Sequence, residues 1–266
     1  MDFGLQGKTA FISGSTGGIG YAIASALAGE GVQVIVNGRD DARVDAAVER
    51  LEREHPGSTA RGLVADFGDA GGVAELLDAL DALGEIDILV NNVGLFGLAP
   101  FESVDDDEWA RYFDVNVMSG VRLSRRLLGR MVERGWGRII FISSESGVNV
   151  PADMVHYGVT KAAMLALGNG LAKHTRGTAV TVNTVLGGPT YSDGVAATVE
   201  TIAEAQSLSA DSMKQAIIAQ NQTTLLQRFI TPAEIANLVV YLASPLASAT
   251  NGAAIRADGG VLTGML

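Results

Sequence analysis

The chain has 266 residues, of which 47% are hydrophobic and 18% charged, so it can bury a substantial core and is not intrinsically disordered. Its formal net charge of −11 repels phosphate polyanions, and we therefore expect no nucleic-acid partner. The absence of cysteine excludes disulfides, thiolate metal sites and a cysteine nucleophile, and we expect no metal centre.

The sequence shows no targeting or membrane-spanning segment. Its opening, MDFGLQGKTAFISG, lacks a basic region followed by a long apolar run. No stretch approaches the roughly 18–20 continuous apolar residues needed to span a bilayer. We therefore expect a soluble, cytoplasmic protein that does not engage a membrane.

Apolar runs typical of strands alternate with segments of helical period along the whole chain. The strand-like runs are Thr9–Ser13, Val32–Asn37, Gly62–Asp66, Ile86–Asn91, Arg138–Ser143, Val180–Leu186 and Ala253–Ala257. The first six are continuous rather than alternating in polarity, as expected for strands covered on both faces. The helical segments are Ile19–Ala28, Ala42–Glu54, Val73–Leu83, Val117–Glu133 and Val159–Lys173. This alternation predicts an α/β fold, a Rossmann-like doubly wound parallel sheet of about seven strands with helices on both faces.

A late helix carries a clear start signal, with Thr231 as N-cap, Pro232 in the first turn and Glu234 at the capping-box position. Before it, residues 190–227 form a polar insertion with two weakly helical patches, at 195–205 and 210–220. An insertion past the carboxyl end of a strand lies where open α/β sheets bind ligands. Since no linker or repeat is visible, we expect residues 1–266 to form a single domain, with this insertion as its substrate loop.

A glycine-rich segment follows the first strand directly and leads into a helix. It reads Ser13-Gly14-Ser15-Thr16-Gly17-Gly18-Ile19-Gly20. Glycines permit a tight turn and a close backbone approach to a pyrophosphate, and the helix N-terminus favours the anion. The alternative is a purely structural strand–helix turn. Its place after the first strand of a repeating β/α pattern favours a dinucleotide-binding loop.

The end of the second strand indicates which nicotinamide cofactor binds. A carboxylate there would bond the adenosine ribose, whereas an arginine accommodates a 2′-phosphate. The strand ends at Asn37 and is followed by Gly38 and Arg39, whose planar donors suit a phosphate. Arg39 could instead be a solvated surface residue, and a shifted strand end could bring Asp40 or Asp41 to the ribose. We expect NADP(H), with NAD(H) as the alternative.

Tyr157 and Lys161 stand four residues apart, so they project from the same face of a helix. A free tyrosine keeps its proton to about pH 10, and a nearby cation lowers that pKa towards a useful acid–base range. By itself the pair could also be a buried tyrosine beside a surface lysine. Ser144, 13 residues before Tyr157, closes the fifth strand and can hydrogen-bond a substrate oxygen.

Two further motifs complete the pattern: Asn91-Asn92-Val93-Gly94 closes the fourth strand, and Asp114-Val115-Asn116-Val117 opens the helix before the fifth. With these motifs in order from Lys8 to Gly260, the sequence resembles the short-chain dehydrogenases/reductases. The resemblance implies a single-domain enzyme of about 250 residues that transfers a hydride between NADP(H) and a carbonyl or secondary alcohol, as a ketone or aldehyde reductase does.

The resemblance also implies roles for individual residues. The catalytic tetrad would be Asn116, Ser144, Tyr157 and Lys161. Tyr157 would act as general acid/base, Ser144 would hold the substrate oxygen, Lys161 would bind the nicotinamide ribose and lower the tyrosine's pKa, and Asn116 would anchor a water. The expected cofactor-binding residues are Gly14, Thr16, Gly17, Gly18, Ile19, Gly20, Arg39, Asp66, Phe67, Asn92, Gly94, Tyr157, Lys161, Gly188 and Thr190. Taken alone, Asn116 could be a helix N-cap and Ser144 a turn former.

Three positions depart from the family pattern. Gly17 stands where many NADP(H)-preferring relatives place a basic residue, which leaves Arg39 more alone. Gly187 replaces the proline of the usual Pro-Gly pair, so the loop over the nicotinamide would be more mobile. Val93 replaces an alanine, a change that we expect to be tolerated.

The substrate is expected to be a small carbonyl or alcohol in a partly apolar pocket. The residues expected to line the pocket are Phe96, Val148, Met154 and Tyr191. We expect His156 to be a bystander beside Tyr157, because neighbours on a helix face different directions, and the alternative is that it also lines the pocket. The family resemblance implies a homo-oligomer, a dimer or tetramer, formed through the helices containing 116–133 and 157–176. Two alternatives to the main hypothesis remain: an NAD(H)-dependent alcohol dehydrogenase, and a nucleotide-sensing protein without catalysis.

Overall fold

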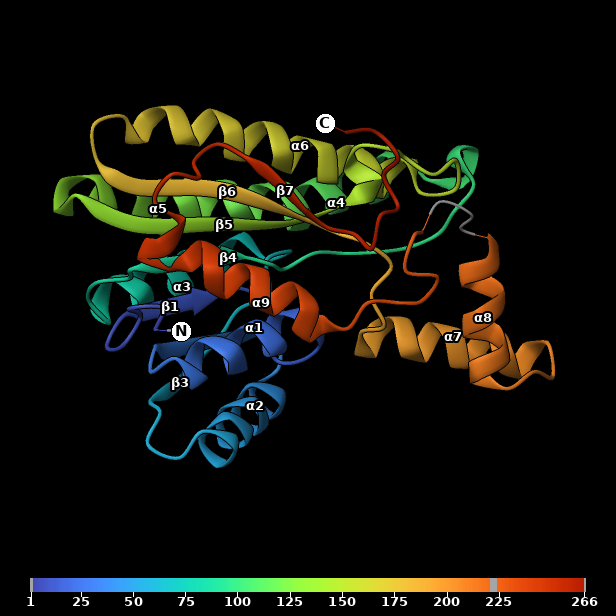
Figure 1. The fold of residues 1–266 in the computed structure, drawn as a ribbon, viewed down its shortest axis with the longest axis horizontal. Helices are drawn as coiled ribbons and strands as arrows, with labels where there is room; N and C mark the ends of the chain where they lie inside the picture. The colour runs from blue at the N-terminus through green and yellow to red at the C-terminus, as the bar shows by residue number, and fades with distance from the viewer. Residues whose placement is uncertain (1, 221–223, 266) are drawn as a thin grey trace.

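The computed structural model describes residues 2–220 and 224–265, and its seven strands form one sheet (Figure 1). The strands are β1 (Thr9–Ile12), β2 (Gln33–Gly38), β3 (Ala60–Val64), β4 (Ile88–Asn91), β5 (Trp136–Ser144), β6 (Ala179–Gly187) and β7 (Ala254–Ala257). Their order is β3-β2-β1-β4-β5-β6-β7, and every pairing is parallel. The predicted Rossmann-like doubly wound sheet is confirmed. Because the chain order reverses between β1 and β4, the ligand crevice lies at the carboxyl ends of these strands.

Helices cover both faces of the sheet. They are α1 (Gly18–Gly29), α2 (Asp41–Glu54), α3 (Ala70–Ala82), α4 (Asp106–Phe113), α5 (Ser119–Arg134), α6 (Val155–Ala172), α7 (Asp193–Ala205), α8 (Ala210–Gln220) and α9 (Pro232–Ala243). The apolar faces of α1, α2 and α9 pack into one core cluster with side chains such as Ile12 and Val36. The helices α3, α5 and α6 pack into a second cluster around Phe11 and Phe141. No helix in the described part of the chain is long and apolar enough to cross a membrane.

Strand β3 departs from the expectation that the first six strands are covered on both faces. It lies at the edge of the sheet, where Arg61 and Gly62 are exposed and Val64 is 41% exposed. The strand also begins two residues before the expected Gly62 and ends at Val64 rather than Asp66. An edge strand has a neighbour on one side only, so its composition is a poor guide to its burial.

The helix that precedes β5 begins earlier than expected. The sequence pattern does not predict α4, and it places Asn116 near the start of a helix. In the structure α4 and α5 are joined by a single π-helical turn over Asp114–Met118, so Asn116 lies in the middle of one long helical segment. The alternative role of Asn116 as a helix N-cap is therefore wrong. A π-turn widens the backbone locally and is frequent at functional sites.

The other expected helices are present, although α3 begins at Ala70 rather than Val73 and α6 at Val155 rather than Val159. The helix α9 begins at Pro232, and the Glu234 carboxylate accepts a hydrogen bond from the Thr231 backbone N–H at 2.8 Å. Both weakly helical patches of the 190–227 insertion are helices, although 221–223 lie outside the described residues. Figure 1 shows α7 and α8 as a pair set beside the main body. We call residues 193–220 the α7–α8 arm.

Candidate active site

The glycine-rich loop has a geometry that side chains would prevent. Gly14 and Gly18 have φ values of +62° and +55°, in the left-handed region that favours glycine. A Cβ at Gly20 would lie only 2.3 Å from the Gly14 carbonyl oxygen. The Asn92 side chain donates to that same oxygen at 2.8 Å and to the Ser13 carbonyl at 3.0 Å, which ties β4 to the loop. Helix α1 thus begins with its N-terminus facing the crevice.

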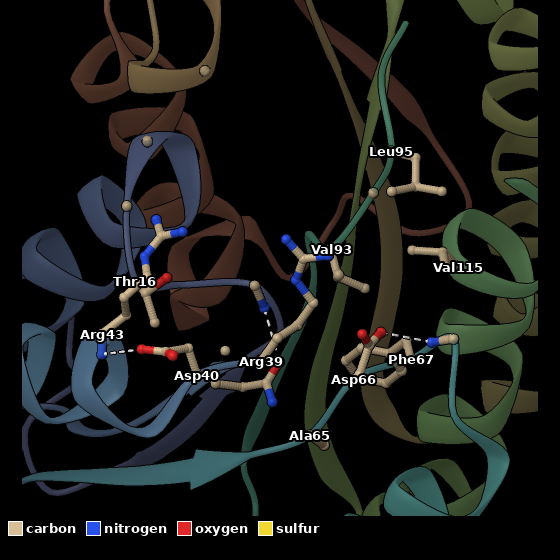
Figure 2. A pocket seen from close by; sticks show the side chains of 18 of the residues that line it. Thr16, Arg39, Asp40, Arg43, Ala65, Asp66, Phe67, Val93, Leu95 and Val115 are labelled. Atoms are coloured by element: carbon tan, nitrogen blue, oxygen red, sulfur yellow. Dashed lines mark hydrogen bonds between the residues drawn. The ribbon is translucent and has the colours of Figure 1, made fainter. Parts of the chain in front are cut away.

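A cavity of about 570 Å³ opens beside this loop (Figure 2). Its wall contains eight of the residues expected to bind the cofactor: Gly14, Thr16, Gly17, Gly18, Arg39, Asp66, Phe67 and Gly94. The features expected of a dinucleotide site surround the cavity: the glycine loop, the carboxyl ends of β1, β2 and β4, and two arginines near the loop, Arg39 and Arg43, besides Arg111 of α4.

Arg43, the second of these arginines, was not among the residues predicted to bind the cofactor. Asp40 is the N-cap of α2 and accepts a hydrogen bond from the Arg43 backbone N–H at 2.9 Å, as Figure 2 shows. This cap places Arg43 in the first turn, where its guanidinium lies 3.9 Å from the position of a Cβ on Gly17. Arg43 therefore supplies a cation beside the loop position that lacks one. The signal in the sequence was an N-cap aspartate three residues before an arginine.

The end of β2, where the residue type distinguishes NAD(H) from NADP(H) binding, carries Asn37 rather than an acid. Its Oδ1 accepts a hydrogen bond from the Gly14 backbone N–H at 3.0 Å, and its Nδ2 donates to the Leu63 carbonyl at 3.1 Å. Asn37 thus ties three strand ends together. Because Asp40 is used as the helix cap, Arg39 and Arg43 are the nearest cations and neither is paired with a carboxylate within ion-pair distance among the described residues.

Asp193, the first residue of the α7–α8 arm, reaches into the same cavity. Its Oδ2 accepts a hydrogen bond from the Gly18 backbone N–H at 2.9 Å. The first N–H groups of a helix attract anions, since the helix dipole and unpaired donors both favour negative charge there. The Asp193 carboxylate therefore contacts one of the donors that a phosphate would use.

Several expected cofactor residues lie outside the cavity wall and shape it instead. The Ile19 side chain packs against the core beneath the loop. A Cβ at Gly188 would lie 2.4 Å from the Asp258 carbonyl oxygen, so glycine is needed where β6 leaves the sheet. The Thr190 hydroxyl donates to the Gly188 carbonyl at 2.8 Å. Contacts of Ile19, Gly20, Asn92, Gly188 and Thr190 with a cofactor remain predictions.

At the inner end of the cavity, two polar side chains of the expected tetrad meet at Gly94. A Cβ on Gly94 would lie 3.4 Å from Asn116 Oδ1 and 3.5 Å from Lys161 Nζ. The Asn116 amide accepts from the Leu95 N–H at 2.6 Å and donates to the Leu95 carbonyl and to the Thr160 hydroxyl, at 3.1 and 2.9 Å. Its side-chain donors are thus occupied by protein groups, and the expected water-anchoring role stays a prediction.

Helix α6 is locked onto the end of β5, which fixes the other tetrad members relative to one another. The Ser143 hydroxyl donates to the Lys161 carbonyl at 2.9 Å. Lys161 Nζ donates to the Ile142 carbonyl at 2.9 Å and lies 5.5 Å from the centroid of the Tyr157 ring. A Cβ on Gly147 would lie 2.8 Å from the carbonyl carbon of Lys161, so only glycine allows this close approach.

Burial dominates the protonation of this site. It raises the pKa of Tyr157 above its ordinary value, against a hydrogen bond with Ser144 that lowers it, and the charge of Glu145 raises it further. Burial also lowers the pKa of Lys161 to about 8, partly opposed by the charge of Glu145. The expected lowering of the tyrosine's pKa by Lys161 is not seen here. Burial penalises the phenolate of Tyr157 directly, and this effect outweighs the stabilisation that a neighbouring ammonium would give.

Glu145 lies in a segment, 145–157, that was expected to contribute to the substrate pocket, but no role of its own was predicted for it. It follows Ser144 directly and begins a short 3₁₀ turn, Glu145–Gly147, at the end of β5. The Ser144 hydroxyl donates a short hydrogen bond to its carboxylate, and the Ser146 N–H donates to Ser144 Oγ at 3.1 Å. Burial raises the pKa of Glu145, against hydrogen bonds from Ser144 and Ser146 that lower it. The signal in the sequence that could have pointed to Glu145 was an acidic residue directly after the serine that ends β5.

The four residues expected to line the substrate pocket lie in different settings. Phe96 is 52% exposed and packs edge-on against Tyr157, with ring centroids 5.5 Å apart. Val148 is also exposed, whereas Met154 is buried. Tyr191 packs against Phe229 at the base of the α7–α8 arm. Phe96 is thus the pocket residue that the structure places against the tetrad.

His156, expected to be a bystander, is buried against the ring of Tyr112, with centroids 4.4 Å apart. It therefore packs between α6 and α4, against Tyr112 and Trp109.

Comparisons with known proteins find similarity along nearly the whole chain. A family model described as enoyl-(acyl carrier protein) reductase matches residues 14–262. The chain is 44% identical over 263 residues to the uncharacterized oxidoreductase YvaG of Bacillus subtilis, covering 98% of both proteins. It is 33% identical to a D-beta-hydroxybutyrate dehydrogenase of Cupriavidus necator, covering 96% of this chain and 98% of that protein.

A solved structure resembles this one closely. It is the L-sorbose reductase of Gluconobacter frateurii in complex with NADPH and L-sorbose, which is 30% identical, covers 100% of both chains and superposes with a TM-score of 0.94.

Proposed function

The chain belongs to the short-chain dehydrogenase/reductase family of oxidoreductases, and from this premise we propose that it uses NADP(H) to interconvert a ketone or aldehyde and its alcohol, with Tyr157 as general acid/base. The observation that carries the proposal is the convergence of Asn116 and Lys161 at Gly94, on the edge of the nucleotide cavity, with Tyr157 one helical turn before Lys161. One sheet carries both the loop and these groups, which supports one dinucleotide-binding and catalytic domain.

The cavity fits a nicotinamide dinucleotide because its glycines leave room for a pyrophosphate against the backbone. Residues Gly14 to Gly20 would hold the phosphates, and Gly94 would let the nicotinamide end approach Lys161. When bound, the reduced cofactor supplies the hydride for the carbonyl carbon. The protein's own residues then have to hold the carbonyl oxygen and give it a proton.

Tyr157 is suited to donate that proton. Burial raises its pKa, so the phenol is protonated at neutral pH and ready to act as an acid in the reducing direction. Ser144 lies next to it and would hold the carbonyl oxygen, which gains negative charge as the reaction proceeds. Lys161 is expected to become a full ammonium once a phenolate forms nearby, since opposite charges favour each other's ionisation.

The preference for NADP(H) rests on Arg39 and Arg43. Both guanidinium groups lie in the cavity wall, and arginine binds phosphate through two parallel donors. The bound NADPH in the structurally similar L-sorbose reductase supports the same choice. The alternative, an NAD(H)-dependent alcohol dehydrogenase, would leave both arginines without a function.

We also propose a homo-oligomer that packs through α5 and α6. A groove of about 390 Å³ lies between them and is lined by apolar side chains such as Val121, Leu128 and Leu167. Light scattering on the purified protein would show a dimer or tetramer, and a monomer at micromolar concentration would contradict this assembly.

The decisive experiment is a panel of ketones, aldehydes and alcohols tested with each cofactor, followed by the absorbance of the reduced nicotinamide. We expect turnover of at least one carbonyl compound with NADPH, and a catalytic efficiency with NADH at least about tenfold lower. Higher efficiency with NADH would refute the cofactor preference. Binding of NADPH without turnover of any compound in the panel would support a nucleotide-sensing protein instead.

A further inference from the structure

Glu145 places a carboxylate inside the catalytic centre, where the proposed reaction does not use one. It stands at the carboxyl end of β5, and its side chain is only partly exposed. Its charge is close enough to act on both Tyr157 and Lys161, raising the pKa of each. Burial makes the ionised form of a carboxyl group less favourable, so a buried carboxylate needs hydrogen-bond donors from its surroundings.

The donors available to Glu145 are hydroxyl groups and the backbone N–H groups of Glu145 and Ser146. Ser144 donates to one carboxylate oxygen and Ser146 lies 3.4 Å from the other. Among the described residues, no lysine, arginine or histidine lies within ion-pair distance of Glu145. The carboxylate is therefore neither neutralised by a cation nor fully solvated, and it retains lone pairs that can accept further hydrogen bonds.

The bond from Ser144 also conflicts with its proposed role. A hydroxyl has one proton, and the proton that Ser144 gives to Glu145 cannot at the same time be given to a carbonyl oxygen of a substrate. A substrate that brings its own donor to Glu145 would remove this conflict, because Ser144 could then turn its proton towards the reacting oxygen.

We propose that Glu145 is a specificity-determining residue that selects neutral carbonyl substrates carrying a hydroxyl group on the carbon next to the reacting carbonyl. This inference rests on the proposed function. The substrate hydroxyl donates to the Glu145 carboxylate in place of Ser144, and the released Ser144 proton is donated to the carbonyl oxygen beside Tyr157. Recognition and activation are thus coupled through one exchange of hydrogen bonds.

The same carboxylate disfavours anionic substrates. A substrate carboxylate near the reacting carbon would face Glu145 at short range in a partly buried site, where like charges repel strongly. Hydroxyketones and ketoses therefore fit this site, and keto acids do not. The similar L-sorbose reductase acts on a hydroxyl-bearing ketone, whereas the similar D-beta-hydroxybutyrate dehydrogenase, by its name, acts on a carboxylate, and Glu145 favours the first pattern for this chain.

Two matched pairs of substrates test the inference. Hydroxyacetone and butanone differ by a hydroxyl in place of a methyl group, and methyl acetoacetate and acetoacetate differ by the negative charge. For the unaltered protein we expect kcat/KM to be at least about tenfold higher for hydroxyacetone than for butanone, as for a site built to bond a substrate hydroxyl. We expect a preference of similar size for the ester over the acid.

The variants Glu145→Gln and Glu145→Ala should reduce both preferences about tenfold. The kcat/KM for acetoacetate itself should rise in both variants. Glu75→Gln, an exposed glutamate on α3, serves as the matched control and should leave both ratios unchanged. Retained NADPH binding, followed by its fluorescence, shows that each variant is folded.

The outcomes separate the two proposals. Unchanged ratios in folded Glu145 variants, or an unaltered protein that reduces butanone as well as hydroxyacetone, would overturn the role of Glu145 and leave the proposed function standing. An unaltered protein that reduces none of the four compounds and no other carbonyl would refute the proposed function itself.

Discussion

The sheet body and the α7–α8 arm are held together in different ways. The body buries two large apolar clusters, one on each face of the sheet. The arm has a small cluster of its own, in which Val199, Ala203 and Met213 are buried. The proposed catalytic groups all lie on body elements, β5, α6 and the π-turn, whereas the arm contributes Asp193 to the nucleotide cavity. Chemistry therefore depends on the stable region, and binding is adjusted by a region with few buried contacts.

The largest expected effect is in the body, at Tyr157. The change Tyr157→Phe removes the proposed proton donor while keeping the ring that packs against Phe96. We expect kcat to fall about 1,000-fold, within the range for loss of a general acid, with NADPH affinity changed less than about twofold. Steady-state kinetics and fluorescence titration measure both. Tyr241→Phe, on the exposed side of α9, is the control, and substantial activity in Tyr157→Phe would remove this residue from the mechanism.

The two arginines of the body should come next. We expect Arg39→Ala and Arg43→Ala each to lower kcat/KM for NADPH about tenfold through loss of a charged phosphate bond, and to leave the value for NADH unchanged. Arg53→Ala, near the other end of the helix that contains Arg43 and largely exposed, is the matched control. Equal losses with both cofactors would show that the arginines support folding of this region rather than the 2′-phosphate.

Lys161 should show that the catalytic centre lowers the stability of the body. Its pKa is about 8 in the folded protein against an ordinary value of 10.5, so the folded state binds the proton less well than the unfolded one. Stability is therefore lost as the pH falls from about 10.5 to 8, and the loss of roughly 3 kcal/mol is complete below that range.

Replacing this lysine with a neutral side chain of similar length tests whether its charge destabilises the folded protein. At pH 7, Lys161→Met should raise the free energy of unfolding by about 1–2 kcal/mol, since losing the bond to Ile142 offsets about 1 kcal/mol of the gain. Above pH 10.5 the cost of the buried charge is absent, so the variant should be less stable than the unaltered protein by about 1 kcal/mol. Urea unfolding at the two pH values measures it, with exposed Lys173→Met as control. A destabilised variant at pH 7 would contradict the direction of the pKa shift.

The same substitution made once in each region tests the comparison directly. Val182 in β6 and Val199 in α7 are both buried, in the second core cluster and in the arm cluster. We expect Val182→Ala to lower the global stability by about 1–3 kcal/mol with little change in KM. Val199→Ala should leave Tm nearly unchanged and raise the KM for the carbonyl substrate a few-fold. Equal falls in Tm would mean that the arm folds with the body as one cooperative unit.

The smallest effect is expected at the contact between the two regions. The Asp193 carboxylate bonds the Gly18 N–H, and a phosphate placed at the same helix N-terminus would have to compete with it. Asp193→Asn removes the charge and should strengthen NADPH binding about two- to fivefold, as for a single charge at a helix end. Glu200→Gln, exposed on the same helix, is the control. Weaker binding in Asp193→Asn would show that Asp193 assists the cofactor instead.

Local chemistry and periodicity were sufficient to predict the fold and much of the site. Strand-like apolar runs, six of them continuous, identified all seven strands, and the glycine loop could be placed because a tight turn needs glycine at fixed positions. The i, i+4 spacing of Tyr157 and Lys161 put both on one face of α6. The prediction that β3 is covered on both faces was wrong, because the burial of an edge strand depends on neighbouring elements that its own residues do not specify.

The tertiary structure decided the protonation and the partners of the site. Asp193 and Gly18 are 175 residues apart in the chain, and only folding brings this carboxylate to the loop. Arg43 lies beside Gly17 in the first turn of α2, which Asp40 caps, and Asn116 lies within a π-turn and bonds Leu95 and Thr160. The sequence alone determined which residue types are present and how they are spaced. Which buried polar groups share a hydrogen bond, and therefore which of them hold their protons, was settled only when distant segments packed together and excluded water.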